Sequence, residues 1–180
     1  NPPKLSKNDT PILNVIVSNS DLSYSNYPIM AGHFLNDSIL FAEKVIDYKL
    51  NLALTTRNQL GIHVGQIGQS EVILSDNNDF QGAIILGLGK FGNLTGSELS
   101  KTVEMGVCNY LIETQNRYPE KTKIGVSTLI IGCNYGGLSV ENSTISILEG
   151  INNANRKIKN LIKNAAIIED VEFIERYEDR

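Results

Sequence analysis

Apolar, β-branched runs alternate with amphipathic helical segments along most of this chain. Parallel strands need a crossover connection, most often a helix, so this alternation favours a mostly parallel or mixed sheet with helices on both faces. The predicted fold class is α/β, with three α/β/α layers. The predicted strands cover residues 11–18, 27–34, 71–74, 83–88, 123–131 and 166–177. The predicted helices cover 38–52, 95–118 and a last segment that starts at Ser139 or Asn142 and ends at 163.

Local signals mark several of these boundaries. Asn36 or Asp37 offers an N-cap to the first helix, and residues 95–98 (TGSE) form a capping box before the second. Pro28 and Gly32 predict a short or irregular strand at 27–34, because proline cannot donate to a strand ladder. A polar cluster at 75–79 separates two sequential strands, 71–74 and 83–88.

The chain has 180 residues, which is about one domain and enough to bury a core without a disulfide or a metal. Residues 1–10 have no initiator methionine and no signal-peptide layout, so they are predicted to be a linker. We expect residues 11–180 to form a single domain that was cut from a longer chain.

Composition excludes several classes of function. The net charge of −4 lacks the basic surplus that a phosphate backbone demands, so nucleic acid is not an expected partner. No apolar run approaches the roughly 20 residues of a membrane span, so no membrane association is expected. The two cysteines, Cys108 and Cys133, are too few for a disulfide framework and lack a metal-ligand spacing, which indicates a reducing compartment and a cytoplasmic location.

Residues 82–92, GAIILGLGKFG, end in a G-x-G-x-x-G pattern at Gly87, Gly89 and Gly92. Such a pattern after a strand is typical of dinucleotide-binding sites when it also opens a helix and an acidic residue ends the next strand. Here the capping box starts the helix later, at Thr95, and the strand after that helix has no carboxylate at its end. We therefore interpret the pattern as a structural turn that closes a strand, and no cofactor is expected.

Several segments together resemble the N-terminal domain of leucyl aminopeptidases over about 120 residues. They are Leu50-Asn51, residues 61–69 (GIHVGQIGQ), residues 87–90 (GLGK), the helix that follows and residues 147–151 (ILEGI). The resemblance implies a macrodomain-like α/β/α fold. In that family the metal ions and the catalytic residues belong to a separate C-terminal domain, and this chain shows no Lys, Asp and Glu cluster at metal-ligand spacing. Neither peptidase activity nor a metal site is expected.

Residues 27–37 (YPIMAGHFLND) and 172–180 (EFIERYEDR) resemble a domain of large bacterial multidomain proteins that also carry a caspase-like CHAT domain. That resemblance implies an accessory module whose protease lies elsewhere, and whose partners are other domains of the same polypeptide.

The candidate ligand site is the glycine-rich segment 132–139, GCNYGGLS, which joins a strand to a helix N-terminus. Free amides and a helix dipole attract anions, and in macrodomains a similarly placed loop wraps the phosphates of ADP-ribose. The candidate residues are Gly132, Asn134, Tyr135, Gly136, Gly137 and Ser139. The alternative is a tight turn that needs positive φ. The asparagine-rich macrodomain motif for the distal ribose is missing, which argues against specificity for ADP-ribose.

Four other side chains are considered as candidates for a chemical role. His33 precedes Asn36-Asp37, so it is either a proton-transfer group or a hydrogen-bonded structural histidine, and we favour the second. His63, in a glycine-rich loop, is predicted to be exposed and inert. Cys133 lacks an assignable base, so a small buried side chain is the favoured role over a nucleophile. Lys90 is predicted to be a surface lysine.

These observations leave three functional hypotheses, and no catalytic residue is assigned. The first is a non-catalytic accessory domain, used for interaction or regulation, in a larger bacterial protein. The second is binding or hydrolysis of ADP-ribose or a related nucleotide through residues 132–139. The third, an enzyme that uses His33 and Cys133, requires those two side chains to lie within hydrogen-bond reach.

Overall fold

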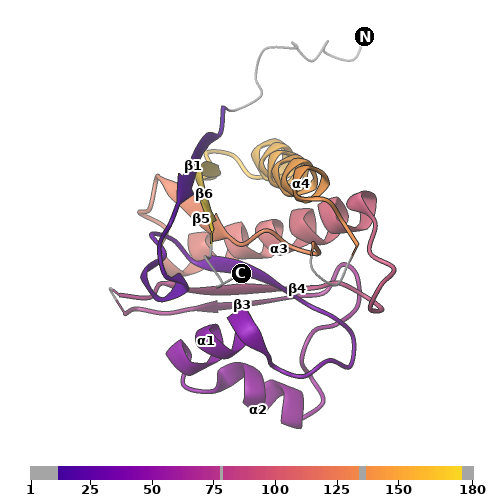
Figure 1. The fold of residues 1–180 in the computed structure, drawn as a ribbon. Helices are drawn as coiled ribbons and strands as arrows, with labels where there is room; N and C mark the ends of the chain where they lie inside the picture. Colours follow the sequence, from indigo (N-terminus) through magenta and orange to yellow (C-terminus); the bar gives the residue numbers. More distant parts are fainter. Residues whose placement is uncertain (1–11, 78, 134–136, 176–180) are drawn as a thin grey trace.

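A computed structural model describes residues 12–77, 79–133 and 137–175 (Figure 1). The strands are β1 (Asn14–Ser18), β2 (Ile29–His33), β3 (Ser70–Leu74), β4 (Gly82–Gly87), β5 (Ile124–Thr128) and β6 (Ile168–Ile174). The α-helices are α1 (Phe41–Lys49), α2 (Ala53–Gln59), α3 (Gly96–Arg117) and α4 (Val140–Leu161), and a short 3-10 helix, η1, spans Leu22–Tyr24.

The strands form one mixed sheet in the order β1-β6-β5-β2-β4-β3. Every described neighbouring pair is parallel except β3 and β4, which run antiparallel and follow each other directly along the chain. The helices α3 and α4 cover one face of the sheet and α1 and α2 the other (Figure 1). The predicted three-layer α/β/α fold is confirmed.

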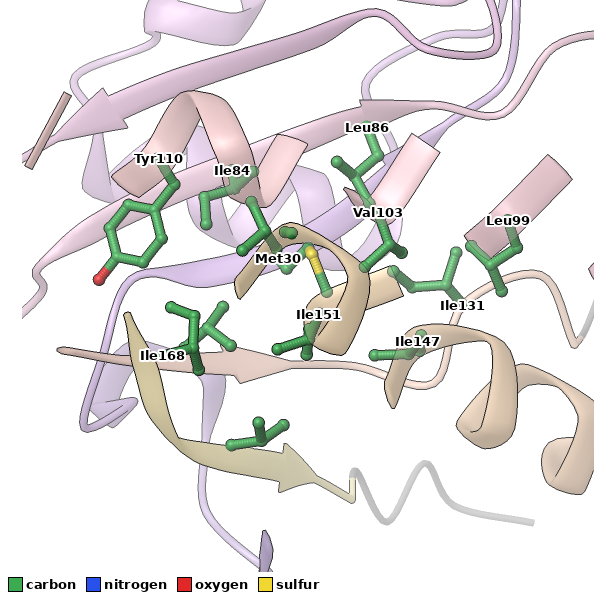
Figure 2. Packing of buried hydrophobic residues seen from close by; sticks show 14 of the residues in the cluster. Met30, Ile84, Leu86, Leu99, Val103, Tyr110, Ile131, Ile147, Ile151 and Ile168 are labelled. Atoms are coloured by element: carbon green, nitrogen blue, oxygen red, sulfur yellow. The ribbon is translucent and has the colours of Figure 1, made fainter. Parts of the chain in front are cut away.

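The larger core lies between the sheet and the pair α3 and α4, where Met30 of β2 is packed between strand and helix side chains (Figure 2). The two helices approach closely at Gly150, where an added Cβ would lie 2.6 Å from the carbonyl oxygen of Ser100. The opposite face holds a smaller core under α1 and α2, formed by residues such as Ile46, Leu54 and Ile85. Every residue of β4 is buried, because this strand is covered on both faces.

Local signals predicted the long helices well. Thr95 caps α3 as expected, with its Oγ1 accepting from the Glu98 amide at 3.2 Å, and Ser139 caps α4 in the same way. Of the short or irregular strand predicted at 27–34, the structure shows a short one: β2 has five residues and is regular, because Pro28 lies just before its first residue.

The single helix predicted over 38–52 is wrong. The helix α1 begins only at Phe41, and a second helix, α2, follows after Asn51 and Leu52, which adopt left-handed φ angles of 55° and 63°. The buried carboxylate of Asp47 explains the second helix, since it accepts hydrogen bonds from the Leu54 amide at 2.8 Å and from Thr55. A side chain within α1 therefore supplies the N-terminal cap of α2.

None of the helices in the described ranges has the length and apolarity that crossing a bilayer requires.

Candidate functional site at the carboxyl edge of the sheet

The sheet reverses its winding direction between β2 and β5, which lie side by side at its centre. After β2 the chain continues through α1 and α2 to β3 and β4 on one side of β2. After β5 it continues through α4 to β6 on the opposite side. The paired residues of β2 and β5 end at Met30 and Thr128, while β2 continues beside β4 as far as His33. Open α/β sheets bind ligands at such a switch point, outside the carboxyl ends of the strands.

Three strand ends converge at this edge. An added Cβ on Gly32 of β2 would lie 2.4 Å from a Leu88 side-chain carbon after β4 and 3.0 Å from one of Ile131 after β5. An added Cβ on Gly132 would lie 2.6 Å from the side chain of Leu94, which precedes α3. Small residues thus let the segments after β2, β4 and β5 pack together.

The predicted ligand segment follows β5 and leads into α4. Its first glycine, Gly132, has φ +80° and its carbonyl accepts from the Leu138 amide at 3.1 Å, and Gly137 has φ +76°. The buried Ser143 hydroxyl bonds both the amide and the carbonyl of Ile131, which ties this segment to the first turn of α4. The predicted residues Asn134, Tyr135 and Gly136 lie outside the described residues.

Ser139, the last residue of that prediction, is the N-cap of α4. Its Oγ accepts from the Asn142 amide at 3.1 Å, so the side chain serves the helix. A helix of 22 residues starts here, and its dipole favours an anion nearby. The exposed Glu141 in the first turn adds negative charge that works against this preference.

The G-x-G-x-x-G pattern closes β4 and starts no helix, as its interpretation as a structural turn requires. β4 ends at Gly87, and α3 begins only at Gly96. A Cβ on Gly87 would lie 1.9 Å from the carbonyl oxygen of Gln66, because the loop before β3 crosses the end of β4 there. Lys90 is exposed, as expected.

Beside this edge, under α1, a buried cluster joins His33, Glu43 and His63. The His33 Nδ1 lies 2.7 Å from one carboxylate oxygen of Glu43, and the His63 Nε2 lies 3.4 Å from the other. The two imidazole rings meet edge to face with centroids 4.4 Å apart. The side chains of both histidines are 3% exposed and that of Glu43 is 10% exposed.

This cluster confirms His33 as a hydrogen-bonded histidine but corrects the rest of the prediction. The carboxylate partner is Glu43 rather than a residue of the Asn36-Asp37 pair. The side chain of His63 is buried rather than exposed, although the residue as a whole is half-buried. Its loop is held against the ends of β2 and β4 by Gly65, whose carbonyl accepts from the Gly89 amide at 2.7 Å. Sequence reasoning missed the cluster because its members lie 10 and 20 residues apart, on a strand end, a helix and a loop.

Cys133 does not join this cluster. Within the described ranges, no hydrogen bond links Cys133 to His33, whose Nδ1 is bonded to Glu43. Burial raises the pKa of the Cys133 thiol, which disfavours the nucleophilic thiolate. The requirement of the third hypothesis, a His33 and Cys133 pair within hydrogen-bond reach, is therefore not met.

Two surface hollows are lined by other residues. One, at the amino ends of the parallel strands, is lined by residues that include Pro28, Gln81 and Tyr118. The other runs between α3 and α4, beside Lys101 and Glu149. Neither lining includes a residue of the predicted ligand segment or of the histidine cluster, although Asn142 in the second hollow donates its amide to Ser139.

The fold defined by this sheet order and these layers is that of a macrodomain-like α/β protein. The chain is similar to the macrodomain of Mycobacterium tuberculosis DarG, with a TM-score of 0.57 at 11% sequence identity, covering 91% of this chain and 99% of that one. It is also similar to Thermosipho africanus DarTG in complex with ADP-ribose, with a TM-score of 0.56 at 12% identity over 93% of this chain.

A tomato leucine aminopeptidase is similar as well, with a TM-score of 0.59 at 14% identity over 94% of this chain. The match spans 34% of the aminopeptidase chain and 43% of the DarTG chain. At the level of the fold, the expected likeness to macrodomains and to part of a leucine aminopeptidase is confirmed. No protein-family model and no curated protein matches the sequence.

Proposed function

We propose that this chain is a macrodomain-like module that binds ADP-ribose or a related nucleotide at the switch point between β2 and β5. The observation that carries the proposal is the positive-φ glycine segment after β5, which leads into the N-terminus of a 22-residue helix at that point. Main-chain amides in such a segment can approach a diphosphate closely, because glycine adds no side chain between them.

Two further features support the proposal. The similar DarTG structure is a complex with ADP-ribose. In this chain, the exposed ring of Phe91 after β4 meets Phe34 after β2, with centroids 5.4 Å apart. An aromatic pair between these two loops offers an apolar surface on which a base can stack.

Isothermal titration with ADP-ribose, ADP and AMP in the presence of EDTA tests the proposal. We expect micromolar binding of ADP-ribose or ADP and weaker binding of AMP, which lacks the diphosphate. The Gly137→Val variant should weaken binding at least about tenfold. Its matched control is Gly61→Val, because both glycines have positive φ, +76° and +71°, with open space around an added Cβ.

The two variants should lose similar stability from the strained backbone, so only their nucleotide affinities should differ. If none of the three nucleotides binds at millimolar concentration, or if Gly61→Val weakens binding as much as Gly137→Val, the proposed site is wrong. No release of ADP-ribose from a modified protein is expected, since no hydrogen bond joins Cys133 to a histidine within the described residues and no nucleophile is assigned.

The accessory role is the second candidate, and the exposed strand β1 favours it. Val15, Ile16 and Val17 are 48%, 49% and 63% exposed on a strand at the edge of the sheet. The similar folds in DarTG and the aminopeptidase are parts of longer chains. On this hypothesis residues 11–180 are one domain of a longer polypeptide, with a CHAT domain as the partner that the sequence resemblance implies.

The two candidates predict different results with the full-length polypeptide. An accessory domain should show hydrogen-exchange protection of β1 that is lost when residues 11–180 are produced alone. A nucleotide-binding module should show protection at residues 132–139 on addition of ADP-ribose. Lack of any added protection of β1 in the longer chain would count against the accessory role.

A further inference from the structure

We propose that His33, Glu43 and His63 form a binding site for one divalent transition-metal ion, with Zn²⁺ the best match. This inference does not depend on nucleotide binding. Two imidazoles and one carboxylate are borderline nitrogen and oxygen ligands that suit zinc and disfavour calcium or magnesium, which prefer sets of oxygen ligands. Among the described residues, these three make up the group with metal-binding capacity.

The distances suit a compact metal ion. One ligand atom from each residue lies within 4.8 Å of the other two. Zinc bonds of about 2.0–2.1 Å at tetrahedral angles place neighbouring ligand atoms roughly 3.3 Å apart. The distance of 3.4 Å between His63 Nε2 and a Glu43 oxygen already matches that spacing. The His33 Nδ1 lies closer to Glu43, at 2.7 Å, and no pair of ligand atoms is more than 4.8 Å apart, so side-chain rotation must bring these distances to the same spacing.

A metal ion would neutralise the charge at the centre of the cluster. The buried carboxylate of Glu43 now relies on two imidazoles for its partners. The Nε2 of His63 faces this carboxylate, so it is the ring nitrogen that would bind the ion. Its other ring nitrogen, Nδ1, is buried without a hydrogen-bond partner and would stay so when the ion binds.

The fold holds the three ligands on separate, well-supported segments. His33 ends a strand paired with β4, and Glu43 lies in the first turn of α1. The loop that carries His63 is fixed by Gln69, whose side-chain oxygen accepts from the amides of Gly65 and Gln66 at 3.1 and 3.0 Å. A site built this way is preorganised, and three protein ligands leave the fourth tetrahedral position for water or a ligand group.

The test uses the 180-residue chain, purified without a histidine tag and stripped with chelator. We expect Zn²⁺ to bind with one-to-one stoichiometry and at least micromolar affinity by calorimetry, and Co²⁺ to give the visible spectrum of a four-coordinate nitrogen and oxygen site. Mg²⁺ should compete weakly. Binding of Zn²⁺ should raise the unfolding temperature, and chelator should reverse that rise.

Glu43→Gln and His63→Gln should each weaken Zn²⁺ binding at least about tenfold. The matched control is Glu113→Gln, the same change at an exposed position of α3, which should bind as the unaltered protein does. Cys108→Ser and Cys133→Ser should also keep full affinity and an unchanged Co²⁺ spectrum, which excludes a thiolate site. If a cluster variant fails to fold, the Co²⁺ spectra of the cysteine variants still decide the ligand class.

Three results would overturn the proposal: no saturable Zn²⁺ binding at millimolar concentration, a cobalt–thiolate charge-transfer band that disappears in a cysteine variant, or full affinity in folded Glu43→Gln. The first would leave the cluster as a buried proton-sharing network only. Because nucleotide binding is measured with EDTA present, failure of the metal site and failure of the nucleotide site are observed independently.

Discussion

Single glycines allow the close packing of loops and strand ends at the carboxyl edge. Gly87 admits the carbonyl of Gln66, and Gly32 admits the side chains of Leu88 and Ile131. Gly92, in contrast, has open space around it, although it belongs to the same G-x-G-x-x-G pattern. The glycines of one motif therefore have different physical reasons to be glycine, and this difference can be measured.

We expect Gly87→Ala to destabilise the protein by about 3 kcal/mol or more, because its Cβ meets backbone rather than a movable side chain. For a chain of this size, that lowers the melting temperature by about 6–12 °C. Gly92→Ala should cost only about 1 kcal/mol, from its φ of +85° alone. Thermal unfolding of both variants checks this, and equal losses would contradict the close approach at Gly87.

At the scale of elements, polar side chains bind separate segments into one unit. Asp47 of α1 caps α2, and Asn155 of α4 pairs with both backbone groups of Ile168 at 2.8 Å, where β6 starts. Tyr27, just before β2, donates its hydroxyl to Asp170 of β6 at 2.7 Å. Burial, followed by this hydrogen bond and the nearby negative charge, raises the pKa of Tyr27 to about 12.

Tyr27 should make stability fall at high pH. Its folded pKa is raised above the ordinary value of 10.0, so its contribution is complete below pH 10 and is lost as pH rises toward about 12. Tyr27→Phe should lower stability at pH 7 by about 1–2 kcal/mol through the lost hydrogen bond. It should also flatten the decline between pH 10 and 12.

Urea unfolding at a series of pH values measures both effects. Tyr48→Phe is the control, because Tyr48 is 77% exposed and its loss should leave the decline unchanged. Burial also raises the pKa of Tyr110, so part of the alkaline decline should remain in Tyr27→Phe. A decline as steep as that of the unaltered protein would show that the Tyr27 and Asp170 contact does not hold the proton.

At the scale of the whole molecule, the strands of the sheet differ in how completely they are covered. β4 is buried throughout, whereas β1 forms an edge of the described sheet and leaves three consecutive β-branched side chains exposed. An exposed apolar edge strand is a template for pairing with another chain. Concentrated protein should therefore self-associate through β1 unless a further domain covers it.

Val17→Lys should reduce that self-association without lowering stability by more than about 0.5 kcal/mol, because Val17 is 63% exposed. Sedimentation velocity over a range of protein concentrations measures the effect. Ile112→Lys adds the same charge at a 44% exposed position of α3 and is the control. Equal behaviour of the two variants would mean that net charge, and not the edge strand, governs association.

Sequence by itself determined the features that depend on neighbours along the chain. The alternation of strands and helices, the Thr95 capping box and the strand that ends at Gly87 follow from side-chain periodicity and from hydrogen bonds a few residues long. The missed helix α2 marks the limit of such signals, because its cap comes from Asp47 on the preceding helix rather than from the residue before it.

Only the tertiary structure decided what depends on distant contacts. Strand order placed β2 beside β5 and created the switch point, and no local pattern encodes that adjacency. Packing of α1 and of residues 61–69 against the end of β2 brought His33, Glu43 and His63 together and buried a histidine that its glycine-rich surroundings predicted to be exposed. A loop's burial is set by what packs over it, and that information lies elsewhere in the chain.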